Sequence, residues 1–208
     1  MKVLIISPHP DDLELWAGGT AAKLVSEGYQ VRSIILTDGR KSPRSFQCSD
    51  DEMAKIRKKE GTQAHQVLGI KDFEYFGLPN IKNEKLVEDI LRKELEKEYD
   101  EIYMPDPGDA HSTHVKVAEM TLALARVMNI KSALWSYDGW NFLHNPDKFV
   151  EIEDFLPVKV KAIKCHKSQN TDKKYWEAME KFARVRAILM DPHEITDVKY
   201  AEAFKKLN

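Results

Sequence analysis

Two short polar clusters contain the residue types that hold metal ions and move protons. The first cluster, residues 8–14, contains one histidine and three acids, which are His9, Asp11, Asp12 and Glu14. The second, residues 109–114, contains one acid and two histidines, which are Asp109, His111 and His114. Three acids so close together would repel one another unless a cation lay among them. Imidazole and carboxylate ligands with one open coordination position are typical of a catalytic zinc site.

The spacing within each cluster supports this interpretation. His9 and Asp12 are three residues apart, and so are His111 and His114. This spacing can place both side chains on the same side of a turn. A ligand pair from one loop and a histidine from the other would make a three-ligand site with a water molecule in the fourth position. A neighbouring carboxylate that binds no metal could act as a general base toward that water.

Each cluster taken alone also has a simpler explanation. A histidine pair at this spacing is a weak signal for metal binding, and Asp11 or Asp12 could merely cap the helix that follows. The two clusters together are more specific, because each follows a predicted strand and precedes a predicted helix.

The elements that would position these clusters alternate along the chain. Short apolar segments predict strands at residues 3–6, 31–36, 72–76, 101–104, 132–136 and 149–152. Helices are expected at residues 13–28, with a break or close packing at Gly18-Gly19, and at 50–68, 83–96, 113–128, 158–166, 172–189 and 200–207. This alternation indicates an α/β fold with a Rossmann-like, mostly parallel sheet and helices on both faces. Ligand sites in such folds lie at the C-terminal ends of the strands.

The composition narrows the class of protein. The 208 residues suit a single domain, with a core at about residues 1–137 and a C-terminal extension at about 138–208. The 32 basic and 34 acidic side chains give a net charge of −2, which argues against a nucleic-acid partner. The apolar N-terminus is too short for a signal peptide or a membrane span, and the two cysteines form no CxxC motif. We therefore expect a cytoplasmic protein without a membrane span.

The first cluster resembles the signature of a known family, the PIG-L or LmbE-like N-acetyl deacetylases. That signature is His-Pro-Asp-Asp-x-Glu after the first strand, and residues 9–14 match it in full. Further segments are similar to the family's Arg-x-x-Glu helix ending in Leu-Gly, its second histidine motif, its His-x-Ser-Gln segment and its closing helix: residues 57–69, 109–114, 164–169 and 200–204. The resemblance thus extends over nearly the whole chain.

The resemblance implies zinc-dependent hydrolysis that removes the acetyl group from an N-acetylglucosamine-type amino sugar or its conjugate and releases acetate and a free amine. One zinc ion per chain would be held by His9, Asp12 and His114, and Fe(II) could occupy the same ligands. Asp11 would be the general base. His111, if protonated, would stabilise the oxyanion or give a proton to the leaving amine.

The same resemblance implies supporting roles for other residues. Glu14 would orient the metal loop from behind the ligands, and Arg57 would contact the substrate. His166, in the late segment, lies either near the site or away from it. Three basic residues in the loop at 40–48 either bind an anionic group or are solvated: Arg40, Lys41 and Arg44. Four aromatic residues could stack on a sugar but are explained more simply as core or oligomer contacts: Trp135, Tyr137, Trp140 and Phe142.

The chain departs from the family pattern at two positions. The second motif usually reads His-Pro-Asp-His, and here Thr113 replaces the aspartate. The protonation of His111 is therefore open, and Asp109 is the residue that could supply the missing charge. Asn80 stands where the family often has an aspartate that binds sugar hydroxyls. We expect Asn80 to contact the substrate, while the exact sugar stays open.

Two other functions remain open alongside the deacetylase. One is a non-catalytic metal- or sugar-binding protein of the same fold, and the other is an amidase for a non-sugar N-acyl substrate. A nucleotide-binding oxidoreductase is disfavoured, since Gly18-Gly19 is not part of a GxGxxG motif. The expected partners are a small molecule and further copies of the same chain in a homo-oligomer.

Overall fold

The computed structural model describes residues 1–42, 47–170, 173–190 and 197–208. Within these residues a seven-stranded sheet has the order β3-β2-β1-β4-β5-β7-β6. The strands are β1 (Lys2–Ser7), β2 (Gln30–Thr37), β3 (Asp72–Leu78), β4 (Glu101–Met104), β5 (Ala133–Tyr137), β6 (Lys148–Glu151) and β7 (Ala201–Lys206). The helices are α1 (Asp12–Trp16), α2 (Gly18–Ser26), α3 (Asp50–Leu68), α4 (Glu84–Leu95), α5 (Ser112–Val127), α6 (Leu156–Cys165) and α7 (Tyr175–Met190), with a 3-10 turn η1 (Glu153–Phe155).

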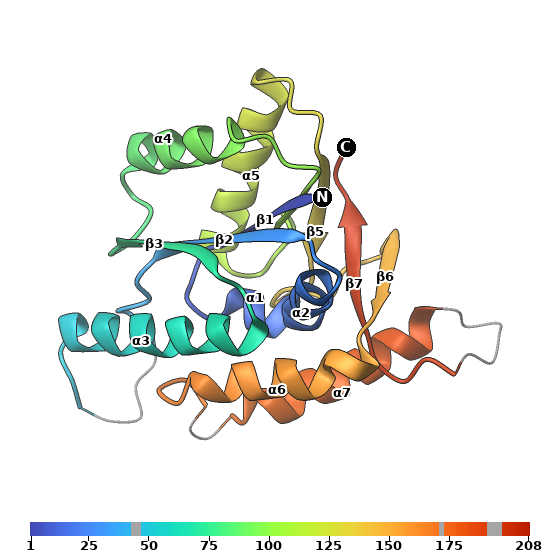
Figure 1. Ribbon diagram of the computed structural model, residues 1–208. Helices are drawn as coiled ribbons and strands as arrows, with labels where there is room; N and C mark the ends of the chain where they lie inside the picture. Colours follow the sequence, from blue (N-terminus) through green and yellow to red (C-terminus); the bar gives the residue numbers. More distant parts are fainter. Residues whose placement is uncertain (43–46, 171–172, 191–196) are drawn as a thin grey trace.

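The sheet is parallel from β3 to β5, and β7 runs antiparallel to both β5 and β6. Helices α4 and α5 cover one face, while α2, α3, α6 and α7 lie on the other (Figure 1). The predicted α/β fold with a mostly parallel sheet and helices on both faces is therefore confirmed.

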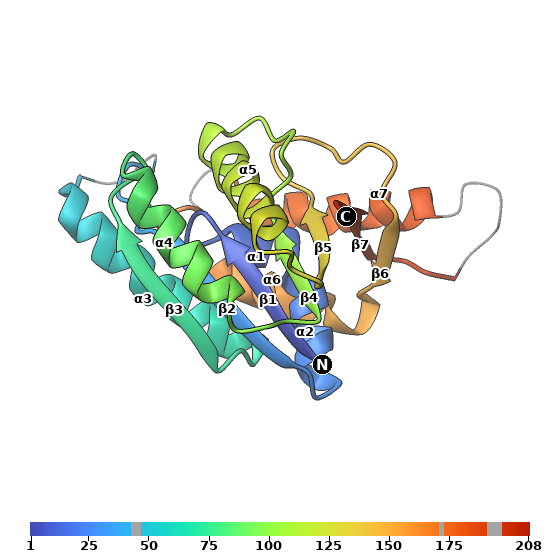
Figure 2. The ribbon, with the colours of Figure 1, turned by 90° about the horizontal axis from the view of Figure 1, so that it is seen from above.

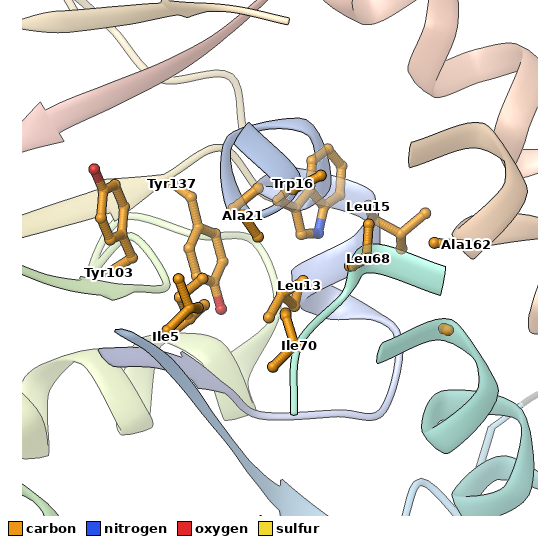
Figure 3. Close-up of a cluster of buried hydrophobic side chains, with 14 of the residues drawn as sticks. Ile5, Leu13, Leu15, Trp16, Ala21, Leu68, Ile70, Tyr103, Tyr137 and Ala162 are labelled. Carbon is orange, nitrogen blue, oxygen red and sulfur yellow. The ribbon is translucent and has the colours of Figure 1, made fainter. Parts of the chain in front are cut away.

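Strand β1 lies in the middle of the core, which explains its uninterrupted apolar sequence. Val3 and Ile5 belong to one buried cluster, and Leu4 and Ile6 belong to a second. Alternate side chains of a strand point to opposite faces, so both faces of β1 are buried. In the first cluster Ile5 packs near Leu13 and Tyr137 (Figure 3).

The neighbours of β1 determine where the polar clusters meet. Strand β1 pairs with β2 on one side and with β4 on the other, and Ile5 is in register with Tyr103. The adjacent strands β1 and β4 end at the same edge of the sheet (Figure 2). The chain continues from β1 to β2 on one side and from β4 to β5 on the other side. This reversal of direction between β1 and β4 marks the topological switch point, where α/β proteins bind ligands.

The predicted break at Gly18-Gly19 is confirmed, because α1 ends at Trp16 and α2 begins at Gly18. Close packing explains the second glycine. A Cβ atom at Gly19 would lie 2.7 Å from Cδ1 of Ile152, so no larger side chain fits there.

One element was predicted wrongly. Residues 200–207 were expected to form a helix, but Ala201–Lys206 is strand β7, inserted between β5 and β6. Ala, Glu and Lys give this segment a good helix propensity. Pairing in the sheet overrides that propensity, because β5 and β6 both need a hydrogen-bonding partner.

The segment expected to be a C-terminal extension contributes β6 and β7 to the same sheet as the core. The division of the chain at about residue 137 stays a prediction. In the part of the chain that the structure describes, no helix is long and apolar enough to cross a membrane.

Candidate metal and catalytic site

Three side chains converge where β1 and β4 end. Nδ1 of His9 lies 3.2 Å from Nε2 of His114 and 3.3 Å from Oδ2 of Asp12. Nε2 of His114 lies 3.2 Å from Oδ1 of Asp12. Tetrahedral zinc with bonds of roughly 2.0–2.1 Å separates its ligand atoms by about 3.3 Å. The three side chains therefore have the chemistry and the spacing to hold one metal ion.

The turn after β1 is closed by a contact between His9 and Asp12. The backbone N–H of His9 donates to Oδ2 of Asp12 over 2.7 Å, and Asp12 is the first residue of α1. Asp11 occupies the N-cap position of α1, but its side chain makes no capping hydrogen bond. Its Oδ1 instead lies 2.6 Å from Nη2 of Arg57. Helix capping thus does not explain why Asp11 is present.

Charge at this centre is arranged to attract a cation. His114 is fully buried, and its Nδ1 lies 3.0 Å from Oδ2 of Asp109. Burial opposes a charge on His114, but Asp12 and Asp109 raise its pKa to about 10. Burial likewise opposes a charge on Asp12, but His114 and His9 hold its pKa well below the usual range. A divalent cation could replace the proton between these side chains.

His111 lies beside these ligands with a different bonding pattern. Its ring centroid is 4.8 Å from the rings of both His9 and His114. Ring nitrogens of the three histidines lie within 4.8 Å of one another, which is a wider spacing than that of His9, Asp12 and His114. Nδ1 of His111 accepts the backbone N–H of Thr113 at 3.3 Å. Burial lowers the pKa of His111, as do the nearby His9 and His114.

These contacts favour a neutral His111 with its proton on Nε2, since Nδ1 is an acceptor. The sequence left the protonation of His111 open, and these contacts favour the neutral ring. Asp109 accepts the backbone N–H of His111 at 2.7 Å and the Nδ1–H of His114 at 3.0 Å. Its carboxylate therefore orients the ring of the buried His114.

Glu14 lies in α1, directly after the turn that carries His9 and Asp12, and is fully buried. One of its oxygens is 3.1 Å from Nδ1 of His65, and the other is 3.4 Å from Nε2 of His166. Burial would raise the pKa of Glu14, but the two histidines lower it to about 2. His166 thus lies next to the metal loop. No motif pointed to His65, which sits within α3 far along the chain from residues 9–14.

The residues expected to contact the substrate are placed less directly. Arg57 is 3 % exposed and directs its guanidinium at Asp11. Asn80 is exposed, and its Oδ1 accepts the backbone N–H of Lys82 at 2.9 Å. No described contact joins Asn80 to the histidine cluster. Contact of Arg57 and Asn80 with substrate stays a prediction.

The basic residues of the loop at 40–48 are engaged with acids. Arg40 pairs with Asp38 and Asp51, and Lys41 pairs with Asp50. These pairs satisfy the charges without an anionic ligand. Arg44 lies outside the described residues.

A depression of about 530 Å³ adjoins the second histidine loop. Its lining combines the residues that flank His111 with charged side chains from the starts of α4 and α5: Glu84, Asp109, Ala110, Ser112, Val115, Lys116, Glu119 and Met120. This volume is in the range of small-molecule sites.

The fold and the site together define a class of protein. It is a Rossmann-like α/β protein with imidazoles and carboxylates gathered at the switch point of its sheet. Residues 4–125 match the family model described as PIG-L: GlcNAc-PI de-N-acetylase. The matched residues are more than half of the chain, and the chain belongs to this family.

Relatives with named activities support a hydrolase that acts on amide bonds. The diacetylchitobiose deacetylase of Thermococcus kodakarensis is 29% identical over 98% of this chain and 82% of its own. The solved structure of N,N'-diacetylchitobiose deacetylase from Pyrococcus horikoshii has a TM-score of 0.79 and 29% identity, over 99% of this chain and 83% of that chain. The predicted family is confirmed.

A second similar structure shows that the fold alone does not determine the reaction. It is GalB, the 4-carboxy-2-hydroxymuconate hydratase from Pseudomonas putida, with a TM-score of 0.80 over 100% of this chain and 96% of that chain. Its sequence is only 17% identical, so the likeness is one of fold. The function has to be argued from the site.

Proposed function

We propose that this protein is a metal-dependent N-deacetylase that hydrolyses the acetamido group of an N-acetylglucosamine-type sugar or its conjugate. The observation that carries the proposal is the spacing of 3.2–3.3 Å among the donor atoms of His9, Asp12 and His114. Asp11 lies next to Asp12 in the chain and is not one of the three residues assigned to the metal. The named deacetylases among the relatives support an amino sugar as substrate.

Zinc is the ion that we assign to His9, Asp12 and His114, because two imidazoles and one carboxylate with an open position are typical of catalytic zinc. When bound, zinc lowers the pKa of its water to about 7 and polarises a carbonyl oxygen. Fe(II) accepts the same ligands and is the alternative ion.

Asp11 is the group that we assign as general base. Arg57 holds its Oδ1 at 2.6 Å, which fixes the orientation of the carboxylate. Oδ2 then accepts the proton from the attacking water, and the water oxygen bonds to the acetyl carbon. Asp11 returns this proton to the amine nitrogen as the C–N bond breaks. Acetate and the free amine are the products.

His111 is the donor that we assign to the carbonyl oxygen. Because the N–H of Thr113 occupies Nδ1, the ring presents Nε2–H. A hydrogen bond from this group strengthens as negative charge develops on the oxygen, and one such donor contributes about 2.7–4 kcal/mol in other enzymes. The role needs no positive charge on His111, so Thr113 in place of the family's aspartate is compatible with catalysis.

Cytoplasmic location and homo-oligomeric assembly stay predictions from the sequence. Among the functions left open, the non-catalytic binding protein is disfavoured by the intact Asp11–Arg57 pair.

The first test is metal content, measured in protein purified without added zinc. We expect about one zinc ion per chain, and acetate release from N-acetylglucosamine or N,N'-diacetylchitobiose. His114→Ala should lose the metal and the activity while keeping its circular dichroism spectrum. His144→Ala is the matched control, because His144 is exposed and outside the cluster. A wild-type protein that neither contains nor retains zinc or Fe(II) would overturn the proposal.

A further inference from the structure

An exposed tryptophan borders the site and has no role in the proposed chemistry. Trp140 is 47% exposed, although large aromatic side chains are mostly buried in soluble proteins. It lies in the connection between β5 and β6, after the strand that neighbours β4. Exposed aromatic residues beside a site are candidates for binding.

Trp140 contacts the second histidine loop directly and the end of the helix that follows the first loop. Its backbone N–H donates to Oδ2 of Asp109 at 3.3 Å, and the same oxygen binds Nδ1 of His114. Its indole ring makes T-shaped contacts with Trp16 and Tyr175, with centroids 5.7 and 6.0 Å apart. Trp16 ends α1, the helix that begins at Asp12. The position of Trp140 is thus determined relative to the ligands from both sides.

The loop that carries Trp140 is held tightly against the second histidine loop. Nδ2 of Asn141 donates to the backbone oxygen of Gly108 at 2.6 Å. At Gly139 a Cβ atom would lie 1.8 Å from Oδ2 of Asp109, so only glycine allows this approach. A preorganised loop loses little entropy when a ligand binds to it.

We propose that Trp140 is an aromatic platform on which a pyranose ring of the substrate stacks while the acetamido group reaches the metal site. The inference rests on the proposed function and adds the residue that recognises the sugar ring. The C–H groups of a pyranose form an apolar face that matches the flat indole, and the hydroxyl groups at its rim stay in water. The carboxylate of Asp109 binds the backbone of Trp140 and the ring of His114, so it sets the distance between these two residues.

Phe142, in the same loop, provides a matched comparison. It is 40% exposed, close to the value for Trp140. The guanidinium of Arg186 lies 3.7 Å from its ring centroid, and Phe182 packs against it at 5.2 Å. One face of Phe142 is therefore occupied by a cation, and no contact joins it to Asp109 in the described structure. We assign no sugar contact to Phe142.

The kinetic test uses Trp140→Leu, Trp140→Tyr and Phe142→Leu with N,N'-diacetylchitobiose as substrate. Leucine keeps the apolar contact with Trp16 but removes the flat ring. We expect KM to rise about tenfold in Trp140→Leu, equivalent to about 1.4 kcal/mol, with kcat and zinc content unchanged. Trp140→Tyr and Phe142→Leu should keep a KM near that of the wild type. An unchanged KM in Trp140→Leu would overturn the proposal. A fall in kcat or in zinc content without a rise in KM would overturn it as well.

A binding measurement separates this inference from the proposed function. The chain has 4 tryptophans, so its intrinsic fluorescence persists in Trp140→Phe. Titration with chitobiose, the deacetylated sugar, should change the wild-type fluorescence in a saturable manner, and Trp140→Phe should abolish the change. The same response in both proteins would refute the platform. If the wild type binds chitobiose through Trp140 but releases no acetate, the platform stands and the deacetylase proposal fails.

Discussion

Asp11 and Asp12 are adjacent acids that receive different surroundings. Asp12 is buried, and its two oxygens lie against His114 and His9. Asp11 is partly exposed and lies against Arg57. The start of α1 at Asp12 causes the difference, because it directs consecutive side chains to different sides of the turn. These surroundings suit the roles proposed for the two acids, metal ligand for Asp12 and general base for Asp11.

Exchange of each acid for its amide should separate the two roles. In Asp11→Asn we expect acetate release to fall by about 10²–10⁴-fold, the usual contribution of a general base, with the zinc content unchanged. In Asp12→Asn we expect the zinc itself to be lost. Both quantities can be measured on one preparation by an acetate assay and by elemental analysis. Near-full turnover in a folded, metallated Asp11→Asn would show that Asp11 is not the base.

At the scale of elements, α3 supports the loop that carries His9 and Asp12 through a close approach at Gly61. A Cβ atom at Gly61 would lie 1.7 Å from the hydroxyl oxygen of Tyr75 in β3 and 3.1 Å from the backbone oxygen of Pro10. Helix α3, strand β3 and the loop that contains Pro10 therefore meet at Gly61, where there is room only for a hydrogen atom.

Gly61→Ala should destabilise the protein although alanine is the better helix former. Overpacking of this kind costs about 1–3 kcal/mol, measurable by urea unfolding. In the double variant Gly61→Ala/Tyr75→Phe, removal of the phenolic oxygen should restore part of that loss. Gly18→Ala is the control, since its nearest neighbour, Cγ of Lys159, would be 3.3 Å away. Strictly additive effects of the two substitutions would contradict the contact.

Arg32 of β2 joins three elements. Its guanidinium binds Asp72 and Glu74 of β3 and Glu94 of α4. Burial would raise the pKa of Glu94, but hydrogen bonds from Arg32 and Lys97 lower it below the ordinary value. A lowered folded-state pKa stabilises the protein above the unfolded-state pKa of about 4.3. That stability is lost as the pH falls through the folded-state pKa.

The corresponding prediction concerns Glu94→Gln. At pH 7 we expect this variant to be less stable than the wild type by about 1 kcal/mol. The difference should shrink at low pH, where Glu94 is protonated in the wild type as well. Urea unfolding of both proteins across the acid range measures it. A gap that stays constant with pH would mean that the charge of Glu94 contributes nothing.

At the scale of the whole molecule, hydrogen bonds connect strand β7 to helices α2 and α6. Glu202 of β7 accepts the backbone N–H groups of Gly19 and Thr20 at 2.9 and 2.7 Å. It also accepts Nζ of Lys159 in α6 at 2.6 Å. All of these groups are buried, so the carboxylate satisfies the start of α2 and neutralises the lysine.

Glu202→Gln should leave Lys159 as an unpaired buried charge. Loss of one partner of a buried ion pair costs about 3–5 kcal/mol, which should lower the thermal midpoint by several degrees. Glu202→Gln/Lys159→Met should regain much of the stability, because no unpaired charge remains. If Glu202→Gln were as stable as the wild type, the pairing of Glu202 with Lys159 would contribute little to stability.

The sequence by itself determined the features that depend on neighbours in the chain. Apolar runs such as residues 3–6 predict buried strands, polar residues after them predict a site, and the full match at residues 9–14 identifies the family. Each is a local pattern, because strand burial and loop chemistry follow from the residues present in one short segment.

Only the tertiary structure decided which distant groups meet. The contact of His9 with His114 exists because β1 pairs with β4. Glu14 meets His65 and His166 because α6 packs against both α1 and α3. Strand β7 was mistaken for a helix because its partners lie far away in sequence. Local propensity is weak, whereas pairing and burial among distant segments involve larger free energies. For that reason the residue types of the candidate site could be read from the sequence, and the network of contacts around them could not.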